Sequence, residues 1–236
     1  TYPTLMPSTP TPLSLTSVFF PTAAEPAELT AAQELAKLTG ARATAGTGKG
    51  VSVALASRGR PAKLHTRAAD TTAWMWLRIA EDGTGEISAT HGSFLFAAVR
   101  LLANSPSDFT REKLAAGVLL PATFGWHRPH WDACLTQYWR SARNFDQEHY
   151  VASLAEAGFT HCEVNGLQAH MPLEDFVAHE YYPQFYTYAP GFNHFVDTDL
   201  TKGTWPGHYL DANLNNLVKL ANLGRKYGLK PGVCMF

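Results

Sequence analysis

Hydrophobic positions in the first part of the chain switch between strand-like and helix-like spacing. An apolar run over residues 18–20 predicts a strand, and apolar side chains then recur at helical spacing up to residue 38. Pro26 fits the first turn of that helix, and Gly40 can cap its carboxyl end. We therefore expect a strand followed by a helix over about residues 26–39.

Further strands and a second helix follow in the same region. Short alternating or apolar runs predict strands at residues 51–55, 74–79 and 86–89, with a turn-rich segment between the last two. Residues 94–102 are apolar almost all round, as in a helix that packs on a sheet. Together these elements predict a small α+β domain over residues 13–103.

Two segments in which hydrophobic residues have no regular spacing flank this domain. Residues 1–12 are rich in Thr, Ser and Pro, which is typical of a linker. Residues 104–130 carry scattered prolines and one short helical pattern at 111–116, so we expect them to form a connector.

From residue 131 the pattern alternates strand, helix, strand, helix, strand. The expected helices start near Asn144 and Asp211 and end at glycines, and the expected strands cover residues 133–139, 160–165 and 230–236. Strand–helix–strand units of this spacing imply a parallel sheet with its helices outside.

A parallel sheet of three strands cannot bury both of its faces. Residues 131–236 are also far fewer than the roughly 250 residues of an eight-stranded barrel. We therefore expect an α/β chain in which the small α+β accessory domain precedes the first three strands of a truncated (β/α)8 TIM barrel. An open, flavodoxin-like sheet is the alternative, because the period alone does not distinguish the two.

Composition narrows the classes of function. Only 17% of the residues are charged and the net charge is −1, which argues against a nucleic-acid binder or a polybasic membrane anchor. No apolar run is long enough for a transmembrane helix, and no signal peptide is recognisable. The location of the protein cannot be read directly, and a secreted or periplasmic one is favoured.

Familiar motifs for metals, cofactors and nucleophiles are missing from the sequence. Three cysteines without paired spacing support neither a disulfide framework nor a zinc ribbon, and we expect them to be small buried residues. His127 and His130 have no third ligand at a recognisable spacing. The glycine run at residues 46–50 lacks the spacing of a phosphate-binding loop and is better explained as a flexible hairpin. We therefore expect neither a metal nor a cofactor.

The segment from Gly166 to Tyr209 stands out because it is long and aromatic. Aromatic rings with polar rims suit sugar rings, and long loops after barrel strands commonly carry function. Most of its rings are expected to pack the loop onto itself. The residues concerned are Phe176, Tyr181, Tyr182, Phe185, Tyr186, Tyr188, Phe192, Phe195, Trp205 and Tyr209.

Polar residues around the second expected barrel strand are candidates for a binding site. Alternation puts Glu163 and Asn165 on the side opposite Cys162. We expect that polar side to face the barrel interior, where a glutamate needs a partner or a function. Arg140 and Arg143 follow the first barrel strand and could pair with Glu163 or with a ligand, and the residues leave both options open.

Three stretches carry a family resemblance, namely Gly85–Leu102, Ser141–Phe145 and Gly158–Asn165. In their order and position they resemble hexosaminidase-type glycoside hydrolases of family 20 and relatives such as α-glucuronidases. Those enzymes place a small α+β domain before a catalytic (β/α)8 barrel. The resemblance covers nearly the whole chain from Leu13 on.

The resemblance implies a glycoside hydrolase that cleaves O-glycosidic bonds of oligo- or polysaccharides. It gives Arg143 the role of holding hydroxyls of the terminal sugar, and it puts the acid residues beyond Phe236. The 236 residues would then have no hydrolytic activity by themselves. Glu163 stands where hexosaminidases usually keep a His, which indicates a divergent relative. The alternative is a non-catalytic carbohydrate-binding or scaffold protein of the same architecture.

Overall fold

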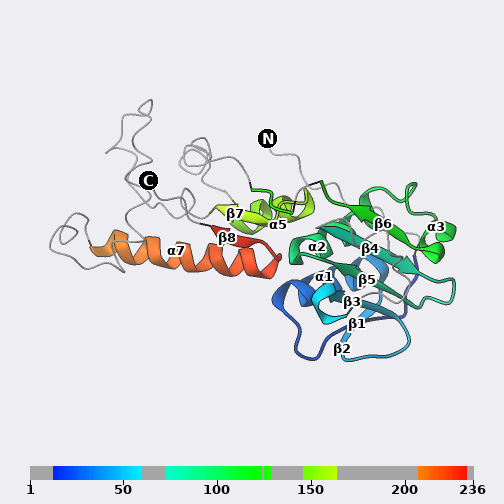
Figure 1. Ribbon diagram of the computed structural model, residues 1–236. Helices are drawn as coiled ribbons and strands as arrows, with labels where there is room; N and C mark the ends of the chain where they lie inside the picture. The colour runs from blue at the N-terminus through cyan, green and yellow to red at the C-terminus, as the bar shows by residue number, and fades with distance from the viewer. Residues whose placement is uncertain (1–12, 60–72, 124, 129–145, 164–206, 233–236) are drawn as a thin grey trace. The chain divides into compact units, whose positions relative to one another are not determined.

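The computed structural model describes residues 13–59, 73–123, 125–128, 146–163 and 207–232 (Figure 1). The fold is mixed α/β, and the chain divides into two compact units. The first unit holds the residues up to His127 together with residues 152–160 and 226–229. The second unit holds the remaining residues.

The first unit is built on a six-stranded mixed sheet with the strand order β2-β1-β3-β5-β4-β6 (Figure 1). Strand β1 runs parallel to β2 and to β3, and β3 runs parallel to β5. Strand β4 runs antiparallel to both β5 and β6. The strands are β1 (Ser17–Phe20), β2 (Arg42–Ala45), β3 (Val51–Leu55), β4 (Trp74–Ile79), β5 (Gly85–Ala89) and β6 (Val118–Pro121).

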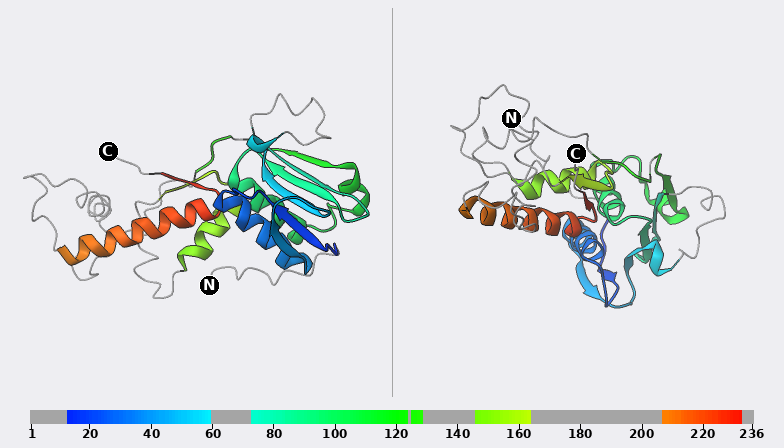
Figure 2. Two further views of the ribbon diagram at one scale, coloured as in Figure 1. Left: turned by 90° about the horizontal axis from the view of Figure 1, so that it is seen from below. Right: turned by 60° about the vertical axis from the view of Figure 1, so that its left-hand side comes forward.

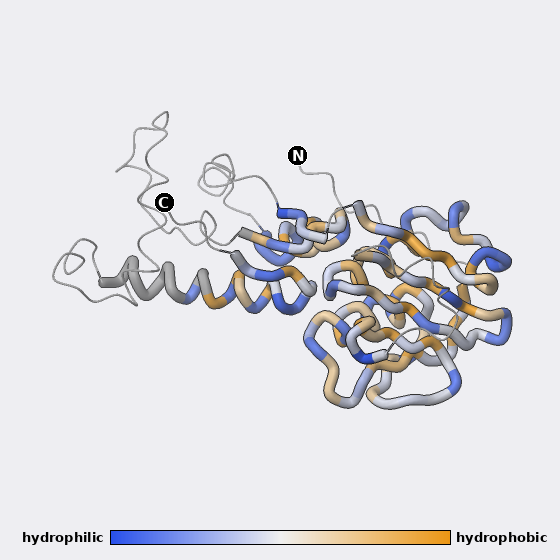
Figure 3. Tube along the Cα trace, in the orientation of Figure 1, coloured by the Kyte–Doolittle hydropathy of each residue, from blue (hydrophilic) through white to orange (hydrophobic). Residues whose placement is uncertain are grey.

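Helices α1 (Pro26–Thr39) and α2 (Gly92–Asn104) pack against each other and on one face of this sheet (Figure 2). Alternation along the strands turns Val53, Leu77 and Ile87 toward the helices, where all three are buried. Hydrophobic positions therefore line the central strands and the two helices (Figure 3). Gly40 ends α1 in the left-handed conformation, as the sequence predicts.

The sheet extends beyond the accessory domain expected from the sequence. Residues 104–130, expected to be a connector, contribute helix α3 (Arg111–Ala116), where a short helix is predicted, and the unpredicted strand β6. Leu114 of α3 is fully buried in the same core. Strand β2 was likewise not predicted, and it forms the exposed edge beside β1.

The glycine run at residues 46–50 is not a hairpin, which corrects the expectation from the sequence. Strands β2 and β3 lie on opposite sides of β1 and both run parallel to it, so the connection crosses β1. A Cβ atom on Gly48 would lie 2.3 Å from the Phe19 ring, and one on Gly50 would lie 2.3 Å from the Ser17 carbonyl oxygen. Gly48 and Gly50 are needed because this crossing leaves no room for a side chain at either position.

The second unit contains a parallel pair of short strands. Strand β7 (His161–Glu163) pairs with β8 (Lys230–Gly232), and helix α7 (Gly207–Lys226) lies between them in the chain. Helix α5 (Gln147–Glu156) precedes β7. This confirms the strand–helix–strand order, but the described strands do not close into a barrel. The expected strand at 133–139 lies outside the described residues.

The buried faces of these two helices follow the sequence pattern only in part. Val151 and Leu154 of α5 are buried as expected. In α7, however, Val218 was expected on the buried face and is 49% exposed, whereas Leu220 and Leu223 are buried. Helix α7 also begins at Gly207 rather than at the expected Asp211.

Candidate functional site

The site expected from the sequence lies at the carboxyl ends of the parallel strands. Glu163 is the last residue of β7, and its register partner is Gly232 of β8. Of the other expected site residues, Arg140, Arg143 and Asn165 lie outside the residues that the structure describes. The structure thus shows Glu163 in a parallel strand, while its role in a site and the grouping of all four residues stay predictions.

Cys162 lies one position before Glu163 and is only 2% exposed. Burial raises the pKa of its thiol to about 11, so the thiol stays protonated near neutral pH. A protonated, buried thiol is neither a nucleophile nor a metal ligand. Cys162 is therefore a small packing residue, as expected, whereas Cys134 and Cys234 lie outside the described part of the chain.

The turn before β7 is tied to the first unit by the Thr160 side chain. The Thr160 hydroxyl accepts a hydrogen bond from the His127 backbone N–H at 2.7 Å and donates to the His127 carbonyl at 3.0 Å. The Thr160 N–H donates to the same carbonyl at 2.8 Å. The Phe159 and His127 rings stack with centroids 4.0 Å apart. Because Gly158 ends α5 with a positive φ, the chain reverses directly into this contact.

The turn before β8 is held in a different way. The Gly228 carbonyl accepts a hydrogen bond from the Ser93 N–H at 3.1 Å and so caps the amino end of α2. A Cβ atom on Gly228 would lie 2.1 Å from the Gly92 carbonyl carbon, so the two backbones touch. Tyr227 packs edge-on against the Phe96 ring at 5.0 Å.

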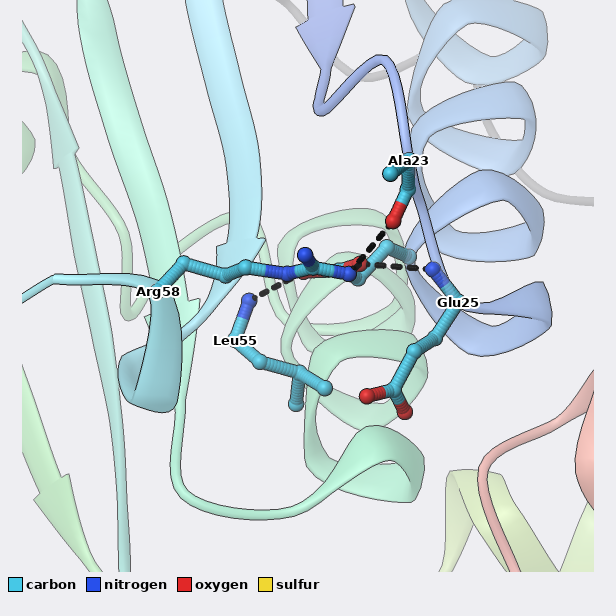
Figure 4. A network of polar contacts seen from close by, with 5 residues as sticks. Ala23, Glu25, Leu55 and Arg58 are labelled. Carbon is cyan, nitrogen blue, oxygen red and sulfur yellow. Dashed lines mark hydrogen bonds and ion pairs between the residues drawn. The ribbon is translucent and has the colours of Figure 1, made fainter.

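A charged cluster forms around Glu28, whose side chain is fully buried. Figure 4 shows the partners Glu25, Leu55 and Arg58 of this cluster. Its carboxylate accepts 2.8 Å hydrogen bonds from the backbone N–H groups of Glu25 and Leu55. The Arg58 guanidinium donates to both carboxylate oxygens, at 3.3 and 3.0 Å. Hydrogen bonding to Glu28, followed by its charge, raises the pKa of Arg58.

The Glu28 cluster has a structural role, because it connects the start of α1 to the end of β3. Every carboxylate oxygen is already occupied by donors from the start of α1, the end of β3 and Arg58. A fully satisfied carboxylate has no lone pair left to accept a proton from a substrate. One feature of the sequence could have indicated this cluster, since a glutamate three residues after the cap position of a helix is typical of a capping box.

Arg100 forms the centre of another charged cluster, which lies within the first unit. Its side chain is only 9% exposed, and it pairs with Glu34 of α1 at 3.1 Å and with Glu156 of α5 at 3.3 Å. Asn104 also donates to Glu156. A nearly buried arginine of α2 thus joins two other helices, which the linear sequence did not indicate.

The described residues contain neither a group suited to a metal ion nor a membrane-spanning helix. That part of the chain contains no group of three or more His, Cys, Asp or Glu side chains suited to a metal ion. None of its helices combines the length and the apolar character needed to cross a bilayer.

The chain was also compared with known proteins. No protein-family model, curated protein or solved structure matches it. The family resemblance suggested by the sequence therefore stays a hypothesis.

Proposed function

We propose that this chain is part of a glycoside hydrolase and binds an oligo- or polysaccharide at the carboxyl ends of its parallel strands. The observation that carries the proposal is the in-register parallel pair β7–β8, connected through α7 and preceded by a separate α+β sheet. This is the order expected of an accessory domain followed by the start of a (β/α)8 barrel. In such barrels, binding residues gather toward the carboxyl ends of the strands, and Glu163 of β7 is the proposed contributor from this strand.

The proposed substrate contacts come from Arg143, Asn165, Glu163 and Arg140. A guanidinium donates to two neighbouring hydroxyls in one plane, and carboxylate and amide oxygens accept from others. Sugars present such hydroxyls all round the ring. In the complete enzyme, carboxylates would serve an oxocarbenium-like transition state, with attack by a substrate N-acetyl group if the enzyme is hexosaminidase-like.

Calorimetric titration with oligosaccharides, including N-acetylglucosamine oligomers, tests this function. Arg143→Ala is expected to weaken binding by about ten- to a hundred-fold, the effect of losing a charged hydrogen bond worth about 1.5 to 3 kcal/mol. Arg42→Ala is the matched control, because Arg42 is exposed on the edge strand β2. Arg42→Ala should leave the affinity unchanged.

The outcomes separate the proposal from its alternatives. If Arg143→Ala lowers the melting temperature but not the affinity, Arg143 pairs with Glu163 structurally and does not bind sugar. Binding without hydrolysis by the protein that carries this chain would favour the non-catalytic, carbohydrate-binding alternative. If none of the oligosaccharides binds, the proposed function is wrong.

A further inference from the structure

The turns that lead into β7 and β8 belong to the same compact unit as the six-stranded sheet. Thr160, which immediately precedes β7, is held by three hydrogen bonds to the His127 backbone. Gly228, two residues before β8, caps the amino end of α2. Each of these turns continues covalently into its strand, so the fixed points lie directly beside the strand starts.

Fixed points beside the strand starts bear directly on how the two strands pair. Within the described residues the pairs run from His161–Lys230 to Glu163–Gly232. A slip of one residue would turn every side chain of β7 to the other face, and Glu163 would exchange places with Cys162. Hydrogen bonds that hold the residue directly before the strand oppose such a slip, because they fix where the strand begins.

We propose that Thr160 and Glu156 are positioning residues that fix the register of β7 and thereby the place of Glu163. As it concerns the sugar site, this inference rests on the proposed function. Thr160 lies about 10 Å along the strand from Glu163, given the rise of a β-strand, so it acts through the backbone. Glu156 anchors the end of α5 one turn earlier through Arg100 and Asn104.

Arg100 supplies a matched pair of variants for the test. It binds Glu156 of α5 and Glu34 of α1 at similar distances, and the two carboxylates are similarly exposed at 23% and 19%. Glu156→Gln and Glu34→Gln therefore each leave Arg100 with one carboxylate. Only Glu156 lies on the segment that leads into β7.

The hydrogen bonds between Thr160 and His127 have a matched control of their own. Thr160→Val keeps the side-chain shape and removes the hydroxyl that joins it to His127. Thr30→Val makes the same change in α1, where the hydroxyl donates only to the Pro26 carbonyl of its own helix. A general loss of stability would not single out one member of each pair.

Hydrogen exchange of backbone amides, read by mass spectrometry on the full chain, is the measurement. Glu156→Gln and Thr160→Val should accelerate exchange across residues 161–163 by about tenfold, the equivalent of one lost hydrogen bond, and leave β3 and β5 unchanged. Glu34→Gln and Thr30→Val should leave residues 161–163 as in the wild type. Unchanged exchange at these residues in Glu156→Gln would overturn the inference, as would equal acceleration in Glu34→Gln.

Sugar affinity in the same variants distinguishes this inference from the proposed function. If wild-type protein binds sugar, Glu156→Gln should weaken that binding while Glu34→Gln does not. If the wild type binds no sugar, the proposed function fails, and the exchange measurement still decides whether Glu156 and Thr160 position β7.

Discussion

At the scale of single residues, burial of a charge is tolerated only where all its hydrogen-bonding capacity is used, and Glu28 meets that condition. Four hydrogen bonds from Glu25, Leu55 and Arg58 replace the water that its carboxylate loses on folding. Removing the negative charge leaves donors facing a group that can no longer accept all of them.

We therefore expect Glu28→Gln to lower the free energy of unfolding by about 2 to 4 kcal/mol. The control is Glu81→Gln, in the exposed turn between β4 and β5, with an expected change within about 0.5 kcal/mol. Urea unfolding followed by circular dichroism measures both. Equal, small losses in the two variants would show that the Glu28 cluster does not hold the fold together.

Cys162 gives a prediction about pH. Burial raises its pKa from 9.0 to about 11, so the folded state holds the thiol proton more tightly than the unfolded state. This contribution to stability is fully present below about pH 9 and is lost as the pH rises toward about 11. In a Cys162→Ala variant, the decline in melting temperature over that range should be shallower than in the wild type. An identical decline would show that ionisation of Cys162 does not contribute.

At the scale of elements, the sequence predicts those whose pattern is long or strongly periodic. Helices α1 and α2 and strands β3, β4 and β5 appear where hydrophobic spacing indicates them. Strand β2 was missed because Arg42–Ala45 has no strong apolar residue and is stabilised by its pairing with β1. The Arg100 cluster was missed because its partners lie far apart in sequence.

Strand β6 leads to a prediction about independent folding. A fragment of residues 13–103 lacks β6, which pairs with β4 from Trp74 to Leu77, and it also lacks the buried Leu114. An unpaired β4 edge exposes main-chain groups and apolar surface. A fragment of residues 13–122 should therefore melt at a higher temperature than the shorter one and stay monomeric. Equal melting temperatures in differential scanning calorimetry would show that β6 adds no stability.

At the scale of the whole molecule, a sheet with two covering helices and a parallel strand pair are established, and the sugar site is proposed. The sequence predicts that Glu163 lies in a parallel strand, and the structure has it in β7, paired with Gly232 of β8. It could not show that the turns before β7 and β8 belong to the first unit, because the partners of Thr160 and Gly228 are backbone groups of residues far away in the sequence. Such contacts leave no pattern in side-chain hydropathy.

The most direct test of the sugar site is hydrogen exchange of the full chain with and without a saturating oligosaccharide. The account predicts slower exchange in peptides that contain residues 140–145 and 163–165, at the expected carboxyl ends of the first two parallel strands. Peptides from β2 and from β6, at the two edges of the six-stranded sheet, should exchange at the same rate in both samples. Protection confined to the six-stranded sheet, or no protection in any peptide, would contradict a sugar site at the carboxyl end of β7.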